Sequence, residues 1–374
     1  IVAVGFLFAA LPIASPVVNI IAIPWFSWVL VPLALLGSLL PFYPVQWLAA
    51  CLAEYTLRAL MWLSEYAPEW SIASAPIPLL VLALIAVGIV LLPRGAGLKP
   101  LACIILMGFI GYRPPAPTQG QAHITVFDAG QGLAILFQTA HKQLLFDTGT
   151  AGIAQMQVIP SIRAAGIQRL DALVLSHHDD DHDGGAKAVQ QALRPRQTWA
   201  GQPEFYPHAQ SCQHAQSWQW DGVHFEFLQV PQFAGQKDND RSCVLRVIAG
   251  EAAFLVTGDL GQTSEHLLVQ HYGEHLYSQV LVLGHHGSKH SSSPAFLAAV
   301  APQYGIASSG FGNLYRHPAQ EVQQRLSQHR ITLLRTDYQG AWQFKLDGSD
   351  KVQAQPFKTH RFHWQKKPWG ESLP

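Results

Sequence analysis

The chain has 374 residues, enough for two or more domains, and its 24 basic residues balance 24 acidic ones. Zero net charge excludes a protein that is basic throughout, so any surface for nucleic acid must be a local patch. The composition changes abruptly near residue 113, which excludes a single uniform domain.

Residues 1–112 are predicted to be membrane-embedded and all-helical, because apolar residues dominate them and only six charges interrupt them. Some apolar stretches are shorter than the ~20 residues that a perpendicular span needs. The stretches are 1–23, 24–40, 45–63, 77–92 and 98–112. The chain opens inside an apolar stretch with neither Met nor a basic leader, so we interpret it as the C-terminal part of a longer membrane region rather than a signal peptide.

The turn between the last two stretches predicts the orientation. Arg94 and Lys99 would place this turn in the cytoplasm, although Arg113 on the other side reduces the bias to two cations against one. The rest of the chain would then emerge outside the cytoplasm. A hairpin resting in the membrane interface is the alternative.

One apolar stretch also carries charge. Glu54, Arg58 and Glu65 fall near one face of a predicted helix, where they can pair. Such a face either lines a polar conduit or faces water on an interfacial helix.

A proline-rich linker, residues 113–121, separates this region from a predicted α/β domain at 122–350, and residues 351–374 form a basic and aromatic tail. Two sheets flanked by helices fit the order of elements. Strands are expected at 124–127, 134–137, 143–146, 170–175, 225–230, 244–248, 253–257, 279–283 and 304–308, with a closing pair near Thr332 and Trp342. Helices are expected at 158–165, at 186–193, at 263–271, after Pro294 and up to His329.

The most informative segment directly follows the strand at 170–175. It contains His177, Asp179, Asp181 and His182 and ends in two glycines. A solvated acidic turn would gain nothing from histidines placed between carboxylates, so the pattern predicts a metal site where a buried strand ends.

Further candidate residues follow other strands. Asp259 closes the strand at 253–257, and His285 and His286 close the strand at 279–283. Asp128 and Asp147 each end an early strand, where they would orient a metal-bound imidazole or act as plain turn aspartates. Cys212 and Cys243 are compatible with a disulfide or with reduced thiols.

These motifs together resemble the metallo-β-lactamase superfamily. The loop Asp128-Ala129-Gly130-Gln131-Gly132, the His-x-Asp-x-Asp-His form of the ligand loop and the ending His285-His286-Gly287-Ser288 more narrowly resemble the ComEC family of DNA-internalisation proteins. The resemblance covers 123 to about 345 by motif and the membrane half by arrangement. It implies an αββα sandwich of two mixed sheets flanked by helices, preceded by an all-α transmembrane region.

The resemblance also implies two divalent metal ions, Mn²⁺ or Zn²⁺. His177 and Asp179 would hold the first ion, Asp181 and His182 the second, and Asp259 would bridge them. One of His285 and His286 would complete the set.

The middle histidine of the superfamily has no evident counterpart; Asn239 and Ser242 stand in that region. Catalytic roles are expected for Asp181, Asp128 and His317. His317, before a proline, would contact the scissile phosphate or protonate the leaving oxygen, unless it is an ordinary loop histidine.

The function implied by the resemblance is an inner-membrane DNA-uptake channel of natural transformation. Its periplasmic hydrolase domain would cleave phosphodiester bonds and degrade the strand that is not imported. Two alternatives remain: a metallo-hydrolase of another small-molecule ester or phosphodiester, and a non-catalytic domain that guides DNA.

The expected partners follow from that function. They are single- or double-stranded DNA, the lipid bilayer, a periplasmic DNA-delivery protein, further copies of the chain and a cytoplasmic ATP-driven translocation partner, since the chain shows no nucleotide-binding loop. The tail from Lys358 to Trp369 interleaves cations with aromatics, which suits single-stranded DNA. A basic solvated tail is the alternative.

Overall fold

The computed structural model describes residues 2–40, 42–67, 69–93, 97–212, 216–230 and 238–357. It divides into two compact units, residues 1–114 with 163–166, and residues 115–162 with 167–374. Arg94 and the cations at 358–369 lie outside the described residues, so the predicted cytoplasmic turn and DNA-binding tail that rest on them stay predictions.

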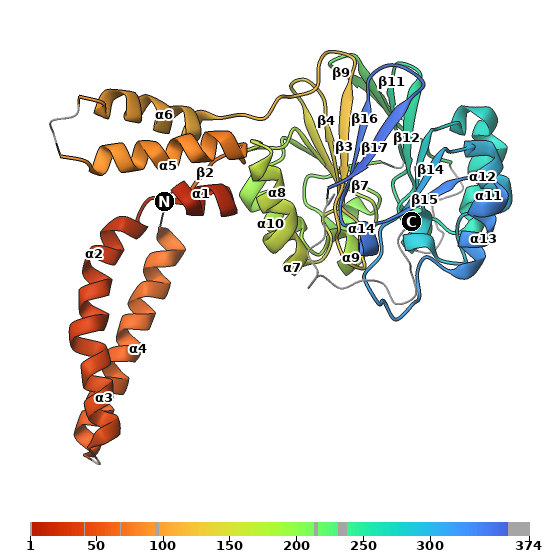
Figure 1. The fold of residues 1–374 in the computed structure, drawn as a ribbon. Coiled ribbons are helices and arrows are strands. Elements are labelled where there is room, and N and C mark those ends of the chain that lie inside the picture. Colours follow the sequence, from red (N-terminus) through yellow and green to blue (C-terminus); the bar gives the residue numbers. More distant parts are fainter. Residues whose placement is uncertain are drawn as a thin grey trace. The chain divides into compact units, whose positions relative to one another are not determined.

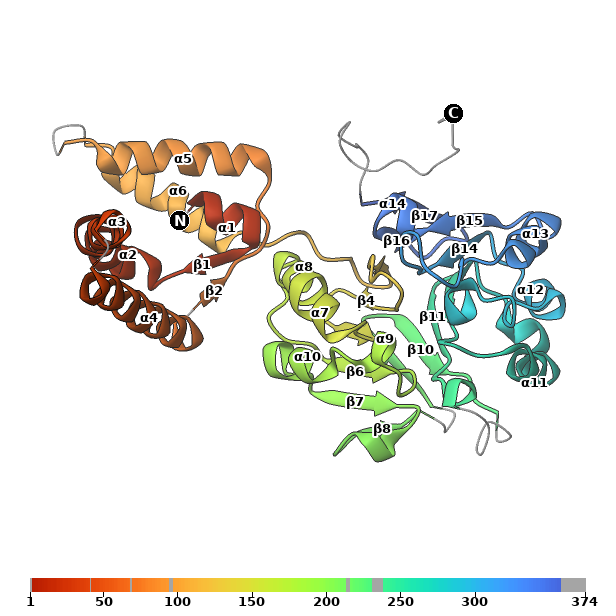
Figure 2. The same ribbon diagram turned by 90° about the horizontal axis from the view of Figure 1, so that it is seen from below.

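The first unit is helical, apart from a small antiparallel pair of strands, β1 (Ala10–Pro12) and β2 (Glu69–Ser71). Figures 1 and 2 show α5 beside α6, and α3 beside α4. The helices are α1 (Val2–Phe8), α2 (Ser15–Trp25), η1 (Phe26–Leu30), α3 (Val31–Leu39), α4 (Tyr43–Tyr66), α5 (Ile77–Leu91) and α6 (Lys99–Gly111).

The expected break between residues 23 and 24 is wrong. Ser15–Leu39 is one continuous helical stretch, and among the described residues it is the one long and apolar enough to cross a membrane. Pro24 lies inside α2 and is followed by the π-helical turn η1. A π turn accommodates a proline because it shifts the backbone hydrogen bonds around the missing N–H.

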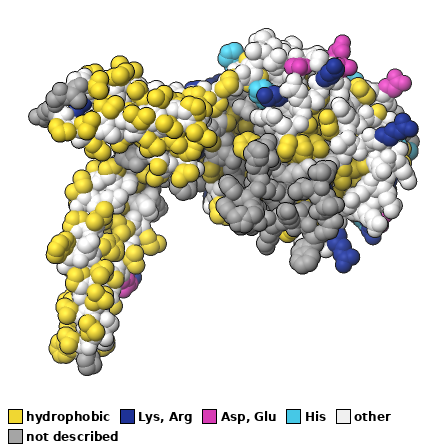
Figure 3. Space-filling view, in the orientation of Figure 1, with side chains coloured by type: hydrophobic (Ala, Val, Ile, Leu, Met, Phe, Trp, Pro, Cys, Tyr) yellow, Lys and Arg dark blue, Asp and Glu magenta, His cyan; other side chains and the backbone are white. Residues whose placement is uncertain are grey.

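The surface of this unit is apolar. Figure 3 shows hydrophobic side chains spread over its helices, and many large ones, such as Ile20, Trp28 and Leu39, are more than 70% exposed. Exposed apolar surface of this extent indicates contact with lipid. On α4, Arg58 donates to Glu54 at 2.6 Å, which is the predicted pairing on the charged face.

The second unit contains two mixed sheets with helices on both outer faces, as predicted. The eight-stranded sheet has the order β17-β16-β3-β4-β5-β6-β7-β8, and β5 to β8 run parallel. Its strands are β3 (Ala122–Val126), β4 (Ile135–Gln138), β5 (Gln143–Phe146), β6 (Ala172–Leu175), β7 (Gln197–Ala200), β8 (Gln210–Ser211), β16 (Trp342–Leu346) and β17 (Val352–Pro356).

The seven-stranded sheet has the order β15-β14-β13-β12-β11-β10-β9, and β12 to β15 run parallel. Its strands are β9 (Ser217–Trp220), β10 (Val223–Phe227), β11 (Leu245–Ala249), β12 (Ala252–Val256), β13 (Val280–Val282), β14 (Tyr304–Ala307) and β15 (Thr332–Arg335). Every residue of β12 is buried, as expected for a strand covered on both faces.

The core lies between the two sheets. Phe137 packs edge-on against Phe225 and Phe254, and Phe254 packs against Phe344, so four strands meet in one aromatic cluster. A second apolar layer lies beneath α11, α12 and α13. The helices and helical turns are α7 (Ala151–Ile153), η3 (Ala154–Val158), α8 (Ile159–Ala164), α9 (Asp180–Asp183), α10 (Ala186–Leu193), η4 (Pro203–Phe205), η6 (Asp238–Arg241), α11 (Gln262–Tyr272), η7 (Gly273–Leu276), η8 (Gly284–Gly287), α12 (Pro294–Val300), α13 (Gln320–Gln328) and α14 (Thr336–Gln339).

The structure differs from the predicted strands near the C-terminus. The expected closing pair is wrong: β15 joins the seven-stranded sheet, and β16 pairs with β3 in the other sheet, because α14 carries the chain across. The strand β17 lies within the segment expected to be a tail, so the sheet extends to Pro356. The strands β7, β8 and β9 had no predicted counterpart, since short strands carry too few residues to show a period.

Candidate metal centre

The candidate ligands follow the carboxyl ends of three strands. His177 and His182 come after β6, Asp259 after β12, and His286 after β13. The parallel strands of both sheets end on the same side of the sandwich, so the segments meet there. In Figure 1 the short helix α9, which carries Asp181 and His182, lies at this edge of the sheets.

The structure brings five of the predicted residues into two overlapping groups. His177, His182 and Asp259 form one, and Asp181, His182 and His286 form the other, each with ligand atoms within 4.8 Å of one another. His182 Nε2 is 3.1 Å from Asp259 Oδ1, and His286 Nε2 is 3.2 Å from Asp181 Oδ2. His182 therefore lies between the two groups.

Each of the three imidazoles is fixed through its Nδ1 atom. His182 donates to Asp147 Oδ2 at 2.8 Å, and His286 donates to the Ser308 carbonyl at 2.8 Å. His177 Nδ1 is 3.0 Å from Ser176 Oγ and 3.3 Å from Ser242 Oγ.

Both serine hydroxyls use their own hydrogens elsewhere. Ser176 donates to Asp147, and Ser242 donates to the Asn239 carbonyl. The two oxygens are thus acceptors for the N–H of His177. With Nδ1 as the donor, each of the three rings can offer Nε2 to a metal ion at the centre.

This donor set fits a metal ion. The buried Nε2 of His177 has no hydrogen-bond partner among the described residues, and Nε2 of His182 and Nε2 of His286 face each other at 3.3 Å. A buried nitrogen without a partner is costly. A cation between these nitrogens and the carboxylates removes this cost.

The electrostatics of the site favour positive charge. Burial lowers the pKa of His182, but Asp259 and Asp147 outweigh burial and raise it well above its ordinary value. Burial raises the pKa of Asp259, yet the neighbouring imidazoles, His182 foremost, hold it well below its ordinary value. Burial and the neighbouring His182 lower the pKa of His177 to about 3, which keeps this ring neutral and able to ligate.

The two adjacent histidines have different places. His286 is buried in the centre, whereas the His285 side chain is 39% exposed, with Nε2 3.8 Å from Asp259 Oδ2. Both residues have positive φ, 50° and 56°, so the backbone turns sharply after β13 and directs the second ring inward. The carbonyl of Ser308, after β14, holds it there.

Asp179 and Asp128 lie outside both groups. Asp179 caps α9 by accepting from the Asp180 N–H at 2.9 Å and lines the cleft in front of the centre. Asp128 is half-buried in the loop after β3 and is not among the described residues that line the cleft. Asp147, one of the two aspartates expected to orient a ligand, contacts His182 at 2.8 Å.

The cleft has a volume of about 370 Å³. Its far side is formed by His317, whose Nδ1 lies 3.3 Å from the amide nitrogen of Gln131. The Gln131 oxygen accepts from Gly310 N–H, so the nitrogen is the atom that faces His317. Burial, then His286 and His285, lowers the pKa of His317 to about 4, and the ring is neutral at pH 7.

The loop before β4 packs closely on the ligand loop. Leu133 N–H donates to the Asp181 carbonyl at 3.1 Å, and a Cβ on Gly132 would lie 2.5 Å from that oxygen. Glycine at 132 therefore permits the contact that positions Asp181.

Sequence reasoning missed Ser176, Ser242 and Ser308 as positioning residues. Ser242 accepts from the Asp259 N–H at 3.1 Å as well as from His177, so it links two ligands where the superfamily histidine is lacking. The flanking Cys243 forms a disulfide with Cys212. Ser176 and Ser308 directly follow β6 and β14, whereas Ser242 lies in the segment before β11 where the superfamily histidine is lacking. Ser308 acts through its backbone.

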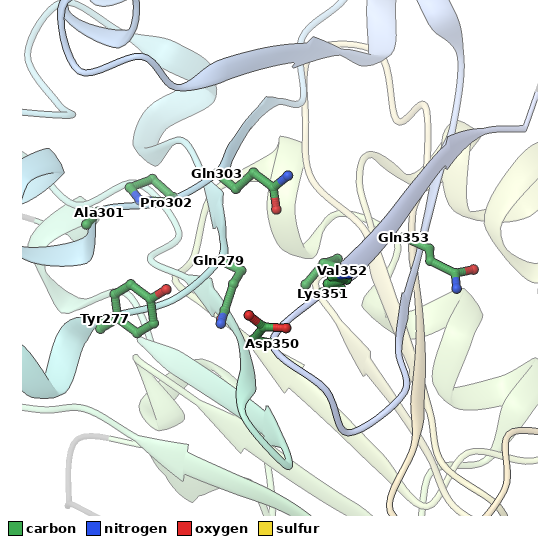
Figure 4. A pocket seen from close by; sticks show the side chains of 9 residues that line it. All are labelled: Tyr277, Gln279, Ala301, Pro302, Gln303, Asp350, Lys351, Val352 and Gln353. Carbon is green, nitrogen blue, oxygen red and sulfur yellow. The ribbon is translucent and has the colours of Figure 1, made fainter.

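A separate hollow of about 620 Å³ lies at the opposite edge of the sheets (Figure 4). Gln279 and Gln303 come directly before β13 and β14, and Asp350 and Lys351 come from the β16–β17 turn. Gln279 is fixed by the backbone of Ala253 and Glu251. This hollow lacks the convergent ligands of the centre.

Comparison with known proteins identifies the chain. Residues 127–310 match the metallo-β-lactamase superfamily, and residues 1–97 match the competence protein family. Over 99% of its length the chain is 57% identical to competence protein ComA of Neisseria gonorrhoeae, of which it covers 53%. The chain belongs to the ComEC family of competence proteins.

Other comparisons give weaker similarity. Recombination protein 2 of Haemophilus influenzae is 31% identical over 64% of the chain, which covers 31% of that protein. The solved metallo-β-lactamase fold protein YhfI of Bacillus subtilis aligns with 59% of the chain and 99% of its own length, with 15% identity and a TM-score of 0.40. This ComEC-family chain spans about half the length of ComA. Its second unit has the fold of a superfamily of metal-dependent hydrolases, which implies binding of a divalent metal.

Proposed function

We propose that the chain acts in DNA uptake and that its second unit is a metal-dependent phosphodiesterase that degrades the DNA strand that is not imported. The observation that carries the proposal is the convergence of three Nε2 atoms with Asp181 and Asp259 beside an open cleft, which Asp181, Asp259 and His286 line. The similarity to a protein named for competence supports DNA as the substrate.

The ligands divide naturally between two ions. His177 and Asp259 would hold one ion, and Asp181 and His286 would hold the other. His182 belongs to both groups, and Asp259 contacts His182 and also lies near His286 of the second group. Bound divalent ions would activate water and stabilise the attacking and leaving oxygens of a phosphodiester. The donors are imidazole and carboxylate with no thiolate, which suits Zn²⁺ or Mn²⁺.

His317 would donate a hydrogen bond to the substrate phosphate. Because Gln131 donates to its Nδ1, the neutral ring carries its proton on Nε2. A group with a pKa of about 4 is largely unprotonated at neutral pH and is poorly suited to protonate a leaving oxygen. Of the two expected roles, phosphate contact is favoured.

We place the catalytic unit on the periplasmic side of a multi-pass inner-membrane protein. A disulfide joins Cys212 and Cys243, and such bonds persist in oxidising compartments. Lys99 is the first residue of α6, next to the turn between α5 and α6, as expected for a cytoplasmic turn. A cytoplasmic motor and a periplasmic DNA-delivery protein would complete the uptake system.

The test is hydrolysis of labelled DNA by the whole purified chain with Mn²⁺ or Zn²⁺. We expect Asp259→Ala and His286→Ala each to reduce the rate by more than about 100-fold, because each removes a ligand. His290→Ala, which changes an exposed histidine four residues further on, is the matched control and should keep the rate.

Two results would contradict the proposal. DNA binding without cleavage under either metal would indicate a guiding domain. Cleavage of small esters or phosphodiesters with no turnover of DNA would indicate the small-molecule hydrolase.

A further inference from the structure

A second hollow adjoins the metal cleft. It has a volume of about 710 Å³ and shares Asp179 and Asp180 with the cleft as lining residues. Its floor is the ligand loop and the start of α10, and its wall is the segment Phe205–Pro207 after β7. The two hollows thus follow each other along the edge of the sheets.

Phe205 is 50% exposed in this second hollow, yet its ring is fixed. It stacks on the His178 ring, with centroids 4.0 Å apart and planes 23° apart. His178 is held in turn by Asp183 and by the Tyr206 hydroxyl. The ring therefore presents one free face whose position is set before any ligand arrives.

The segment that carries Phe205 is itself anchored. Glu204 accepts two hydrogen bonds from Arg241, at 2.6 and 3.1 Å, which ties η4 to η6. Ser242, which fixes His177 and Asp259, follows η6 directly. The platform and the metal ligands consequently share one support.

The metal cleft itself repeats this arrangement. Tyr315 lines the cleft, is 70% exposed and stacks on the His317 ring at 5.6 Å and 25°. Asn313 holds His317 by bonds to its N–H and carbonyl, both 2.8 Å long. An exposed aromatic ring stacked on a histidine thus lines each of the two adjoining hollows.

The charges around Phe205 select the group that would lie there. Asp179, Asp180 and Asp183 line the hollow, and Lys187 is its one lysine or arginine among the described lining residues. A phosphate would be repelled from this wall except at Lys187. A nucleobase is uncharged, and its amino groups can donate to carboxylates.

We propose that Phe205 and Tyr315 are stacking platforms for the bases on either side of the scissile phosphate of a single-stranded nucleic acid. This inference rests on the proposed phosphodiesterase function and names its substrate as single-stranded. Aromatic rings stack on unpaired bases of any sequence. In a duplex those faces are covered by neighbouring bases, so the platforms would reject it.

The test measures binding and hydrolysis separately with the whole chain. Binding of a fluorescent oligothymidylate is followed by anisotropy with Ca²⁺ in place of a transition metal. We expect Phe205→Ala and Tyr315→Ala each to weaken binding by about 10-fold, and Phe205→Trp to restore it. Phe311→Ala is the matched control, because Phe311 is 49% exposed in the same loop as Tyr315 but contacts Tyr338 and does not line the cleft.

An oligonucleotide with abasic positions across the cleft separates stacking from a structural effect. Native and variant chains should bind it equally, since the bases are missing. Unchanged binding of the normal oligonucleotide by both alanine variants, or duplex bound as tightly as single strand, would overturn the inference. The native chain could fail to cleave any phosphodiester with Mn²⁺ or Zn²⁺ while the two alanine variants still bind the normal oligonucleotide more weakly. That result would contradict the proposed function but support the stacking role of Phe205 and Tyr315.

Discussion

At the scale of single residues, the centre depends on how each imidazole is held. Asp147 is fully buried and accepts from Ser176 N–H at 2.6 Å, from Ser176 Oγ at 2.7 Å and from His182 at 2.8 Å. It has a φ of 57°, a conformation that aspartate and asparagine tolerate better than other residues with a side chain. One carboxylate therefore fixes both the ligand loop and the ring of His182.

Asp147→Asn preserves the backbone preference and removes one acceptor, since the amide nitrogen can only donate. We expect metal affinity to fall by about 10–100-fold, as for other partners of ligating histidines. Titration of the chain with Zn²⁺ against a competing chelator measures this. Asp221→Asn is the matched control, because Asp221 also has positive φ, 49°, and contacts Thr139 and His141 at the other end of β5. Equal affinities in the two variants would refute the role of Asp147.

At the scale of elements, the turns opposite the metal centre tie the two sheets together. Asp221, in the β9–β10 turn, accepts from Thr139 Oγ1 at 2.6 Å, from His141 N–H at 2.7 Å and from the His141 ring at 3.0 Å. Thr139 and His141 belong to the β4–β5 turn of the other sheet. Burial would raise the pKa of Asp221, but these donors together lower it below its ordinary value of 3.8.

This shift predicts the pH dependence of the link. A carboxyl whose folded pKa is lowered stabilises the fold above its unfolded pKa and loses that contribution as the pH falls through the folded value. We expect Asp221→Asn to cost about 1 kcal/mol at neutral pH. The difference in thermal midpoint between the native chain and this variant should begin to shrink as the pH falls below 3.8 and vanish below the lower, folded pKa. A difference that is constant down to pH ~2 would contradict this account.

At the scale of the whole molecule, the two units have surfaces suited to different solvents. The first exposes large apolar side chains over its helices, and the second buries its apolar residues between and beneath two sheets. This division, together with the similarity of residues 1–97 to the competence protein family, indicates a membrane protein with an attached hydrolase domain.

The proposed orientation can be tested with reporters fused after the last residue of the chain. We expect alkaline phosphatase to be active and green fluorescent protein to be dark, because the proposal has the second unit outside the cytoplasm, in agreement with the Cys212–Cys243 disulfide. The reverse pattern would place the catalytic unit in the cytoplasm. The same reporters on a known cytoplasmic protein provide the control.

The sequence by itself determined the division into two regions, since composition alone decides which solvent a segment suits. It also located the ligand-rich segments at strand ends, because buried strands are short apolar runs and the residues after them are not. Most strands of the second unit could be predicted for the same reason. The pairing of β16 with β3 could not, because pairing joins residues more than two hundred positions apart.

Only the tertiary structure decided which side chains meet. His285 and His286 are adjacent and chemically identical, so the sequence does not tell which of them is the ligand. The positive φ of both residues and the carbonyl of Ser308 place His286 in the centre. Asp147 and Ser242 became positioning residues only when β5 and β11 were brought beside the ligand loop. The physical reason is that residue type fixes which chemistry is available, whereas side-chain direction and long-range packing fix where it acts.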